Sequence, residues 1–246
     1  MPGRETREPV VGAGLGGDET TAIDEAAERA VVARLEELHA AGENFVLVSE
    51  ELGERRFGDG ERVVVLDPID GSLNAKRGIP FFAVSIAFAA GPTMGDVDFG
   101  YIYDFGSGEE WTATRGGGAL LNGRPLGPDR PKDEIEIISF EATLTSSVAE
   151  QAARMVGLAY RLRIMGSLAL SLCHLAAGRV DAVCSLKPAR SVDIAAAQLL
   201  VRERGLAIEL FEAPPLDAAP LDLSARSRVV AARTPEVCRR LAAALA

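Results

Sequence analysis

The segment of residues 63–74 combines two carboxylates, a glycine and a hydroxyl in close succession. Its apolar first part ends at Asp67, and α/β proteins bind their ligands at the carboxyl ends of strands. The next two residues would turn the chain and bring Asp70 back beside Asp67, where two ionised carboxylates repel each other unless a divalent cation lies between them. Gly71 and Ser72 have little side-chain bulk, so their backbone N–H groups can point at an anion. This pattern predicts a metal site beside a phosphate site.

A second interpretation of this segment is purely structural: both acids would only cap the backbone amides at the start of a helix. From average residue frequencies, a chance match to the pattern D-P-x-D-G-S/T in 246 residues has a probability on the order of one in a few thousand. The pattern therefore favours the metal and phosphate interpretation.

Two more acidic positions stand next to predicted elements. Glu50 and Glu51 follow the apolar run of residues 45–48, which is too short for a helix and indicates a buried strand. If this strand neighbours the one that ends at Asp67, Glu50 would lie against Asp67. Asp193 stands directly before an alanine-rich helix, where an ordinary N-cap explains it equally well when it is taken alone. The alanines predict close packing of that helix beneath a site.

These acidic motifs resemble those of the inositol monophosphatase family, within the lithium-sensitive, magnesium-dependent phosphatase superfamily. The resemblance covers about residue 15 to the C-terminus and is greatest to the archaeal-type inositol monophosphatase/fructose-1,6-bisphosphatases. The order and spacing of the motifs are more specific than any one motif. The matching segments are residues 21–24, 49–51, 67–72, 116–122, 163–167 and 191–196.

Carried over residue by residue, the resemblance implies two bound Mg²⁺ ions. Glu50, Asp67 and the backbone carbonyl of Ile69 would hold one ion. Asp67, Asp70 and Asp193 would hold the other, so that Asp67 bridges the two. Such ions acidify a water molecule and stabilise the leaving alkoxide. The resemblance therefore implies a magnesium-dependent phosphoric monoester hydrolase.

The resemblance also implies catalytic and substrate-binding residues. Asp24 and the Ser72 hydroxyl would orient and deprotonate the attacking water, and Asp67 would take part as the bridging carboxylate. The water would attack phosphorus in line, without a phosphoenzyme. The residues expected to contact the substrate are Asp70, Gly71, Ser72, Arg163, Gly166, Ser167, Leu168, Lys187 and Arg190.

The expected substrate is a small sugar or polyol phosphate, foremost inositol-1-phosphate or fructose-1,6-bisphosphate. Arg163, Lys187 and Arg190 are basic residues near Asp193 in an acidic sequence. They could grip a second phosphate, although exposed surface positions explain them equally well. Lys187 and Arg190 precede Asp193 by only a few residues, which predicts that both lie at the pocket rim.

The elements that position these residues alternate between helices and strands. Proline-rich residues 125–131 suggest a boundary between an α+β half, residues 1–127, and an α/β half, residues 133–246. The fold class is a layered α/β sandwich, and the resemblance implies the α-β-α-β-α order of the sugar phosphatase fold. Predicted helices are residues 24–41, 146–156, 168–177, 194–204 and one that begins at Pro235; predicted strands are residues 45–48, 63–66, 82–88, 135–139, 180–185 and 228–232, with a hairpin of residues 97–103 and 110–115.

Composition excludes several classes of protein. Lys and Arg number 26 against 36 Asp and Glu, and a net charge of −10 argues against a nucleic-acid partner. Only residues 81–90 are continuously hydrophobic or small, which is too short to span a bilayer, and no secretory signal is visible. Three cysteines without ligand or redox spacing indicate a reduced, cytoplasmic protein. The resemblance implies a homodimer.

Two alternatives to the phosphatase fit parts of the sequence. Residues 12–17 fit G-x-G-x-x-G, but the strand before them would be too short for a dinucleotide-binding fold. A lid over the metal site accounts better for these glycines, with Asp18 or Glu19 as a candidate ligand of a third ion.

A catalytically inactive homologue with a regulatory or interaction role is the other alternative, and the intact acidic motifs argue against it.

Overall fold

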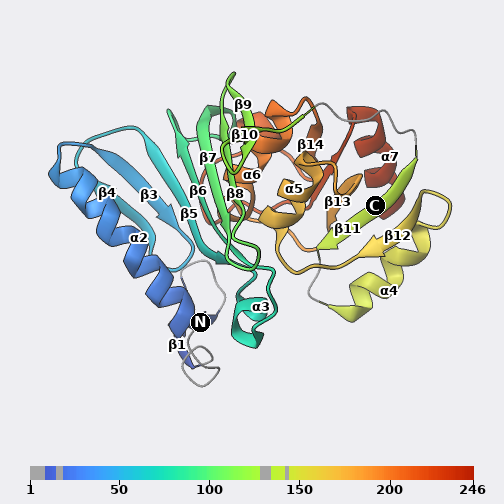
Figure 1. The fold of residues 1–246 in the computed structure, drawn as a ribbon, viewed down its shortest axis with the longest axis horizontal. Coiled ribbons are helices and arrows are strands. Elements are labelled where there is room, and N and C mark those ends of the chain that lie inside the picture. Colours follow the sequence, from blue (N-terminus) through green and yellow to red (C-terminus); the bar gives the residue numbers. More distant parts are fainter. Residues whose placement is uncertain (1–8, 15–18, 128–133, 142–143) are drawn as a thin grey trace.

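The computed structural model describes residues 9–14, 19–127, 134–141 and 144–246, and these form five layers in the order α-β-α-β-α (Figure 1). Helix α2 covers the outer face of the first sheet, α5 and α6 lie between the two sheets, and α4 and α7 cover the outer face of the second sheet. The predicted layered α/β sandwich is confirmed. These helices are α2 (Ala22–Ala40), α4 (Thr145–Arg154), α5 (Leu168–Ala176), α6 (Ser191–Glu203) and α7 (Pro235–Leu245).

Within the described ranges the first sheet has eight strands in the order β10-β9-β8-β7-β6-β5-β3-β4. Only β3 and β5 are parallel neighbours, and every other pair is antiparallel. The strands are β3 (Phe45–Ser49), β4 (Gly53–Phe57), β5 (Val63–Asp70), β6 (Ala83–Ala89), β7 (Val97–Asp104), β8 (Glu110–Thr114), β9 (Gly118–Leu121) and β10 (Arg124–Pro125).

The second sheet has the order β12-β11-β13-β15-β14. Strand β11 runs parallel to both β12 and β13, and β15 is antiparallel to β13 and β14. The strands are β11 (Ile135–Glu141), β12 (Ala159–Arg163), β13 (Ala182–Ser185), β14 (Ala207–Leu210) and β15 (Val229–Ala232). Its parallel centre predicts a ligand site at the carboxyl ends of β11 and β13.

Several short elements complete the fold. Strands β1 (Val10–Ala13) and β2 (Glu19–Thr21) pair before α2, and helix α3 (Ser72–Arg77) follows β5. Strand β4 was not predicted, because it is an edge strand whose three middle residues are charged and exposed. Two 3₁₀ turns, η1 (Met94–Asp96) and η2 (Leu216–Ala218), contact each other across the chain.

Helix α6 lies unusually close to the first sheet because small residues face each other. On β6 the alanine face is fully buried, while the face with Val84 and Phe88 is only half-buried, against α2. A Cβ on Gly100 of β7 would lie 2.7 Å from the Ala196 carbonyl oxygen of α6. The alanine-rich start of α6 therefore packs closely on the sheet, as the sequence predicts.

The two halves share one core. The largest hydrophobic cluster joins side chains of β6, β7 and β8 with those of α5, α6 and β15. Separate clusters lie under α2 and under α7. The expected boundary between the halves falls mostly on residues 128–133, outside the described residues. Because of the shared core, side chains from both halves can be held rigidly in one site.

No helix in the part of the chain that the structure describes has the length and apolar character needed to cross a membrane.

Candidate active site

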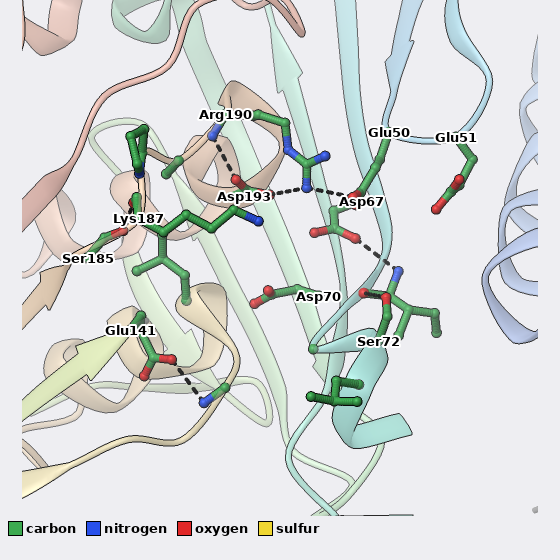
Figure 2. Close-up of a pocket in the computed structure, with 17 residues that line it drawn as sticks. Glu50, Glu51, Asp67, Asp70, Ser72, Glu141, Ser185, Lys187, Arg190 and Asp193 are labelled. Atoms are coloured by element: carbon green, nitrogen blue, oxygen red, sulfur yellow. Dashed lines mark hydrogen bonds and ion pairs between the residues drawn. The ribbon is translucent and has the colours of Figure 1, made fainter. Parts of the chain in front are cut away.

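A cavity of about 320 Å³ lies where the carboxyl ends of four strands meet the start of α6 (Figure 2). Strands β3 and β5 of the first sheet and β11 and β13 of the second each contribute a residue at or just after their end. Its lining includes six carboxyl groups and two basic side chains: Glu50, Glu51, Asp67, Asp70, Glu141, Asp193, Lys187 and Arg190. Its composition therefore favours a cation.

The parallel pairing of β3 and β5 brings Glu50 beside Asp67. Ser49 pairs with Leu66, so the next residue on each strand is an acid at the same edge of the sheet. The Glu50 amide also donates to the Leu66 carbonyl at 3.2 Å, which extends the pairing by one residue. Asp67 is only 1% exposed, and Glu50 is 9% exposed.

Asp193 completes this group from the other half of the chain. Carboxylate oxygens of Glu50, Asp67 and Asp193 all lie within 4.8 Å of one another. Asp193 is the third residue of α6 and also accepts a hydrogen bond from the Arg190 backbone amide at 2.7 Å. The prediction of Asp193 as the N-cap is wrong, because α6 begins earlier: Arg190 is the N-cap, and Asp193 at N3 caps the helix from inside by accepting the bond from the Arg190 amide.

Asp70 lines the same cavity but has different partners. Its Oδ2 accepts hydrogen bonds from the Ser167 hydroxyl at 2.5 Å and from the Ala169 amide at 2.7 Å. These donors belong to the first turn of α5, so Asp70 caps that helix from the opposite half. Strand β5 bulges between Asp67 and Asp70 in its pairing with β6, and both residues line the same cavity.

The carboxylates perturb one another. Burial raises the pKa of Asp67 well above its usual range, and Glu50, Asp70 and Asp193 raise it further. Burial also raises the pKa of Glu50 to about 7, and Arg190 opposes this shift. The pKa of Asp70 is raised to about 7, again mainly by burial, against the hydrogen bond from Ser167. A divalent cation would relieve the repulsion that these shifts express.

The metal-free protein should lose stability as the pH rises from about 4 to above 7. A carboxyl group whose pKa is raised in the folded state binds its proton more tightly there, so its stabilising effect is present below the unfolded pKa and is lost as the pH passes the folded pKa. Mg²⁺ replaces those protons and should raise the melting temperature more at about pH 8 than at about pH 5.5. Melting curves with EDTA and with Mg²⁺ at both pH values test this. Equal Mg²⁺-induced shifts would contradict it.

A second group of contacts joins α2 to the start of α3. The Ser72 Oγ lies 2.9 Å from Asp24 Oδ1 and 2.9 Å from the Ile69 carbonyl oxygen. Asp24 is 1% exposed, and its Oδ2 accepts hydrogen bonds from the Thr21 hydroxyl and amide. The hydroxyl at the edge of the cavity is thereby held by a buried carboxylate, which is the arrangement of a general-base pair.

Gly71 has no room for a side chain. Its φ is +93°, and a Cβ would lie 3.0 Å from the Phe81 carbonyl oxygen and 3.1 Å from that of Gly166. Asn74 fixes the same junction, because its Nδ2 donates to the carbonyls of Phe81 and Met165, each at 2.8 Å. The bond to Met165 crosses from the first half of the chain to the loop before α5.

The structure differs from the sequence expectation at two arginines. Arg190 does not lie at the rim: it is 6% exposed, and its guanidinium contacts Glu50 and Asp193. Arg163 is exposed and does not line this cavity; its guanidinium donates to the Leu162 carbonyl. Lys187 does lie at the rim, exposed, and reaches into the cavity in Figure 2. The difference arises because Arg190 is the N-cap residue of α6, which faces the carboxylates.

The other expected substrate contacts divide into two groups. Gly166 and Leu168 line the cavity together with Gly71 and Ser72. Ser167 is buried beneath it and bonds to Asp70 instead. The expected lid and third-metal ligand at residues 15–18, Asp18 included, and the side chain of Glu19 lie outside what the structure describes.

Two polar residues of the cavity wall, Glu141 and Ser185, were not predicted as site residues. They pair in register at the carboxyl ends of the parallel strands β11 and β13. They could have been found from the predicted strands of residues 135–139 and 180–185, since α/β proteins bind ligands at the carboxyl ends of their strands. Glu141 accepts hydrogen bonds from the Ser171 hydroxyl at 2.5 Å and the Gly166 amide at 2.9 Å. It therefore also holds the loop before α5.

The donor set fits a hard divalent cation such as Mg²⁺. Carboxylates and a backbone carbonyl are the oxygen ligands that Mg²⁺ prefers, and softer metals favour histidine or cysteine. Neither residue type is among the described residues that line the cavity. Glu50, Asp67 and Asp193 already converge to within 4.8 Å, as ligands of one centre must.

Comparison with known proteins identifies the family and the fold of this chain. The family model "Inositol monophosphatase family" matches residues 6–246. A fructose-1,6-bisphosphatase/inositol-1-monophosphatase of Methanothermobacter thermautotrophicus is 32% identical over 98% of this chain and 88% of its own. A Nus factor SuhB of Pasteurella multocida is 35% identical over 76% of this chain and 70% of its own. A crystal structure described as an inositol monophosphatase-fructose 1,6 bisphosphatase superposes with a TM-score of 0.82 at 30% identity, over 98% of this chain and 90% of that one.

Proposed function

The chain belongs to the inositol monophosphatase family, and we propose from this that it hydrolyses small phosphorylated sugars or polyols with the help of Mg²⁺. One observation carries the proposal: the carboxylates of Glu50, Asp67 and Asp193 converge in a cavity that is also lined by Ser72, whose hydroxyl bonds to the buried carboxylate of Asp24. A metal site and a water-activating pair thereby share one cavity.

We assign the metal ligands as the family resemblance implies. Glu50, Asp67 and the Ile69 carbonyl would hold one ion, and Asp67, Asp70 and Asp193 the second. When bound, Mg²⁺ supplies an acidified water and neutralises charge on the phosphate and leaving oxygens. Asp70 would use its Oδ1 for this, because its Oδ2 is bonded to the start of α5.

The proton of the attacking water would pass to the pair formed by Ser72 and Asp24. The Ser72 Oγ can accept a hydrogen bond from that water while it donates its own proton to Asp24 Oδ1, 2.9 Å away. The buried Asp24 is fixed by Thr21, so it can orient the hydroxyl without moving. Such positioned bases contribute about 10²–10⁴-fold to the rate.

The phosphate would bind at the backbone amides of Gly71 and Ser72, and the organic part would face the other wall. Gly71 lines the cavity, and without a side chain its backbone can lie close to a bound phosphate. A Cβ at this position would press against two carbonyl oxygens. Leu168 and Lys187 also line the cavity, together with the unpredicted Glu141 and Ser185, and Gly166 adjoins Gly71. Ser167 supports this wall from beneath through Asp70.

The direct test of the function is phosphate release by the purified protein. Inositol-1-phosphate, fructose-1,6-bisphosphate and 3′-phosphoadenosine 5′-phosphate are each assayed with Mg²⁺ and with EDTA. We expect Mg²⁺-dependent release from at least one of the first two. Absence of release from every compound, in protein that Mg²⁺ stabilises, would favour the interaction role that the relatives named Nus factor SuhB leave open.

Asp193→Ala should weaken Mg²⁺ binding by at least about 100-fold, because even residues that only support metal ligands typically contribute 10–100-fold. Binding is read from the Mg²⁺-dependent rise in melting temperature. The matched control is Asp96→Ala, since Asp96 caps η1 by bonding Thr93 as Asp193 bonds Arg190, but far from the cavity lining. The control should lose cap stability and keep the full Mg²⁺ effect. If both variants keep the full Mg²⁺-dependent rise in melting temperature, Asp193 only caps the helix.

Lys187→Ala should lower kcat/KM for fructose-1,6-bisphosphate by about one to two decades and leave inositol-1-phosphate nearly unchanged. A charge-assisted contact to a second phosphate is worth roughly 1.5–3 kcal/mol, and Lys187 is the exposed cation at the rim. Lys76→Ala is the matched control, because Lys76 does not line the cavity. Parallel losses for both substrates would mean that Lys187 does not read the second phosphate.

We also propose a cytoplasmic homodimer. The three cysteines are free and buried, which fits a reducing compartment. The dimer rests on the family resemblance. The oligomeric state in solution is measured by light scattering.

A further inference from the structure

Arg190 occupies an unusual place for a basic residue. Its Nη2 lies 2.5 Å from Glu50 Oε1 and 3.1 Å from Asp193 Oδ1 (Figure 2). These are two of the three carboxylates that converge in the cavity. The side chain is 7% exposed, so water screens these contacts little. The guanidinium therefore lies inside the acidic cluster.

The backbone of Arg190 is held on both sides, which fixes the point from which its side chain enters the cluster. Ala189 pairs with Ser227 in an isolated bridge, with hydrogen bonds of 2.7 and 3.1 Å in the two directions. The Arg190 amide donates to Asp193 Oδ2 at 2.7 Å, which anchors the residue at the start of α6. The arginine is thus held in the cluster from both sides.

A cation in this cluster and Arg190 would share the same carboxylates. Both Glu50 and Asp193 bond the guanidinium with an oxygen that faces the site, and the two positive charges would repel each other at short range. Removing a buried arginine from two carboxylates also leaves those carboxylates without a counter-charge. Without Arg190, the cluster would therefore bind a metal ion more tightly, and the metal-free protein would be less stable.

We propose that Arg190 is the internal counter-ion of the metal site, and that it keeps Glu50 and Asp193 in place without metal while it weakens Mg²⁺ binding. This rests on the proposed function, since it assumes that the cluster takes Mg²⁺. Arg190 is then a positioning residue that sets the working range of Mg²⁺. It does not read the substrate's second phosphate, because its side chain is only 7% exposed and its guanidinium is directed at two carboxylates.

The test is a Mg²⁺ titration of the melting temperature with no substrate present. It compares the wild type with Arg190→Met, which keeps the length and loses the charge, and with Arg190→Lys, which keeps the charge. Arg161→Met is the matched control for loss of one positive charge, because Arg161 pairs with Glu136 on the exposed side of β12.

We expect Arg190→Met to melt at a lower temperature in EDTA and to reach half of its Mg²⁺ shift at a roughly tenfold or more lower concentration than the wild type. Arg190→Lys should stay within about threefold of the wild type, and Arg161→Met should match it. If Arg190→Met folds only with Mg²⁺, the Mg²⁺ midpoint of its folding is used in the same comparison.

An unchanged or higher Mg²⁺ midpoint in Arg190→Met would overturn the proposal, and so would an equal shift in Arg161→Met. A raised KM for a bisphosphate with an unchanged midpoint would return Arg190 to substrate binding. If Mg²⁺ does not stabilise the wild type, the proposed metal-dependent function fails instead, so the two failures are distinguishable.

Discussion

Asp67→Asn should reduce Mg²⁺-dependent phosphate release by about three orders of magnitude or more while the fold survives. A carboxylate oxygen of Asp67 lies within 4.8 Å of those of Glu50 and Asp193, and Asp67 is almost fully buried. A shared carboxylate contributes to water activation and to charge stabilisation, which together amount to several kcal/mol, and each 1.36 kcal/mol is tenfold in rate. Phosphate release at saturating Mg²⁺ gives the measurement.

The asparagine should not disturb the backbone. Asp67 Oδ1 accepts the Ile69 amide at 3.0 Å, and an asparagine oxygen can accept the same bond. Loss of one negative charge relieves the repulsion from Glu50 and Asp70, so the melting temperature in EDTA should be equal to or above that of the wild type. Asp98→Asn is the control, since Asp98 pairs with Arg62 outside the cavity. Substantial activity in Asp67→Asn would refute the bridging role.

Ser72→Ala should lower kcat by about 10²–10⁴-fold, the range in which a positioned base contributes. The variant removes the hydroxyl that links the cavity to Asp24 and leaves the carboxylates of the metal site untouched. The Mg²⁺ midpoint from melting curves should therefore equal that of the wild type. Ser72→Thr keeps the hydroxyl and is the matched control.

Two results would argue against the Ser72 and Asp24 pair. One is a kcat in Ser72→Ala within about tenfold of the wild type, because metal-activated water would then need no base. The other is a shifted Mg²⁺ midpoint, which would place the hydroxyl among the metal ligands. Recovery of kcat in Ser72→Thr supports the proton-transfer role, since both residues can pass a proton to Asp24.

The site depends on contacts between the two halves of the chain. Asp70 caps α5 from β5, Asn74 bonds the Met165 carbonyl, and Asp193 reaches the cavity from α6. The two hydrogen bonds join residues 99 and 91 positions apart in the sequence. Metal binding should therefore stabilise the shared core as a whole, which is why melting temperature is a useful reading of Mg²⁺ affinity here.

The sequence by itself determined the elements and the chemistry. Apolar runs and alternation predicted most strands of both sheets, since burial of side chains imposes a local period, but they missed the edge strands β4, β10 and β14 and the short β9. The prediction of residues 63–66 and 45–48 as strands that end in acids also held, and their parallel pairing places Glu50 beside Asp67. The order of the acidic motifs was sufficient to indicate the family, because metal ligands and phosphate donors require particular residue types.

Only the tertiary structure decided which partners those residues have. Arg190 and Lys187 are three residues apart, yet one is buried against carboxylates and the other is exposed at the rim. The difference arises because Arg190 is the N-cap of α6, at the point where that helix meets the carboxylates, whereas Lys187 lies in the segment before the helix. Likewise Asp70 bonds to α5, and Glu141 enters the wall from β11. Partners so distant in the chain are chosen by the packing of layers, which no local pattern encodes.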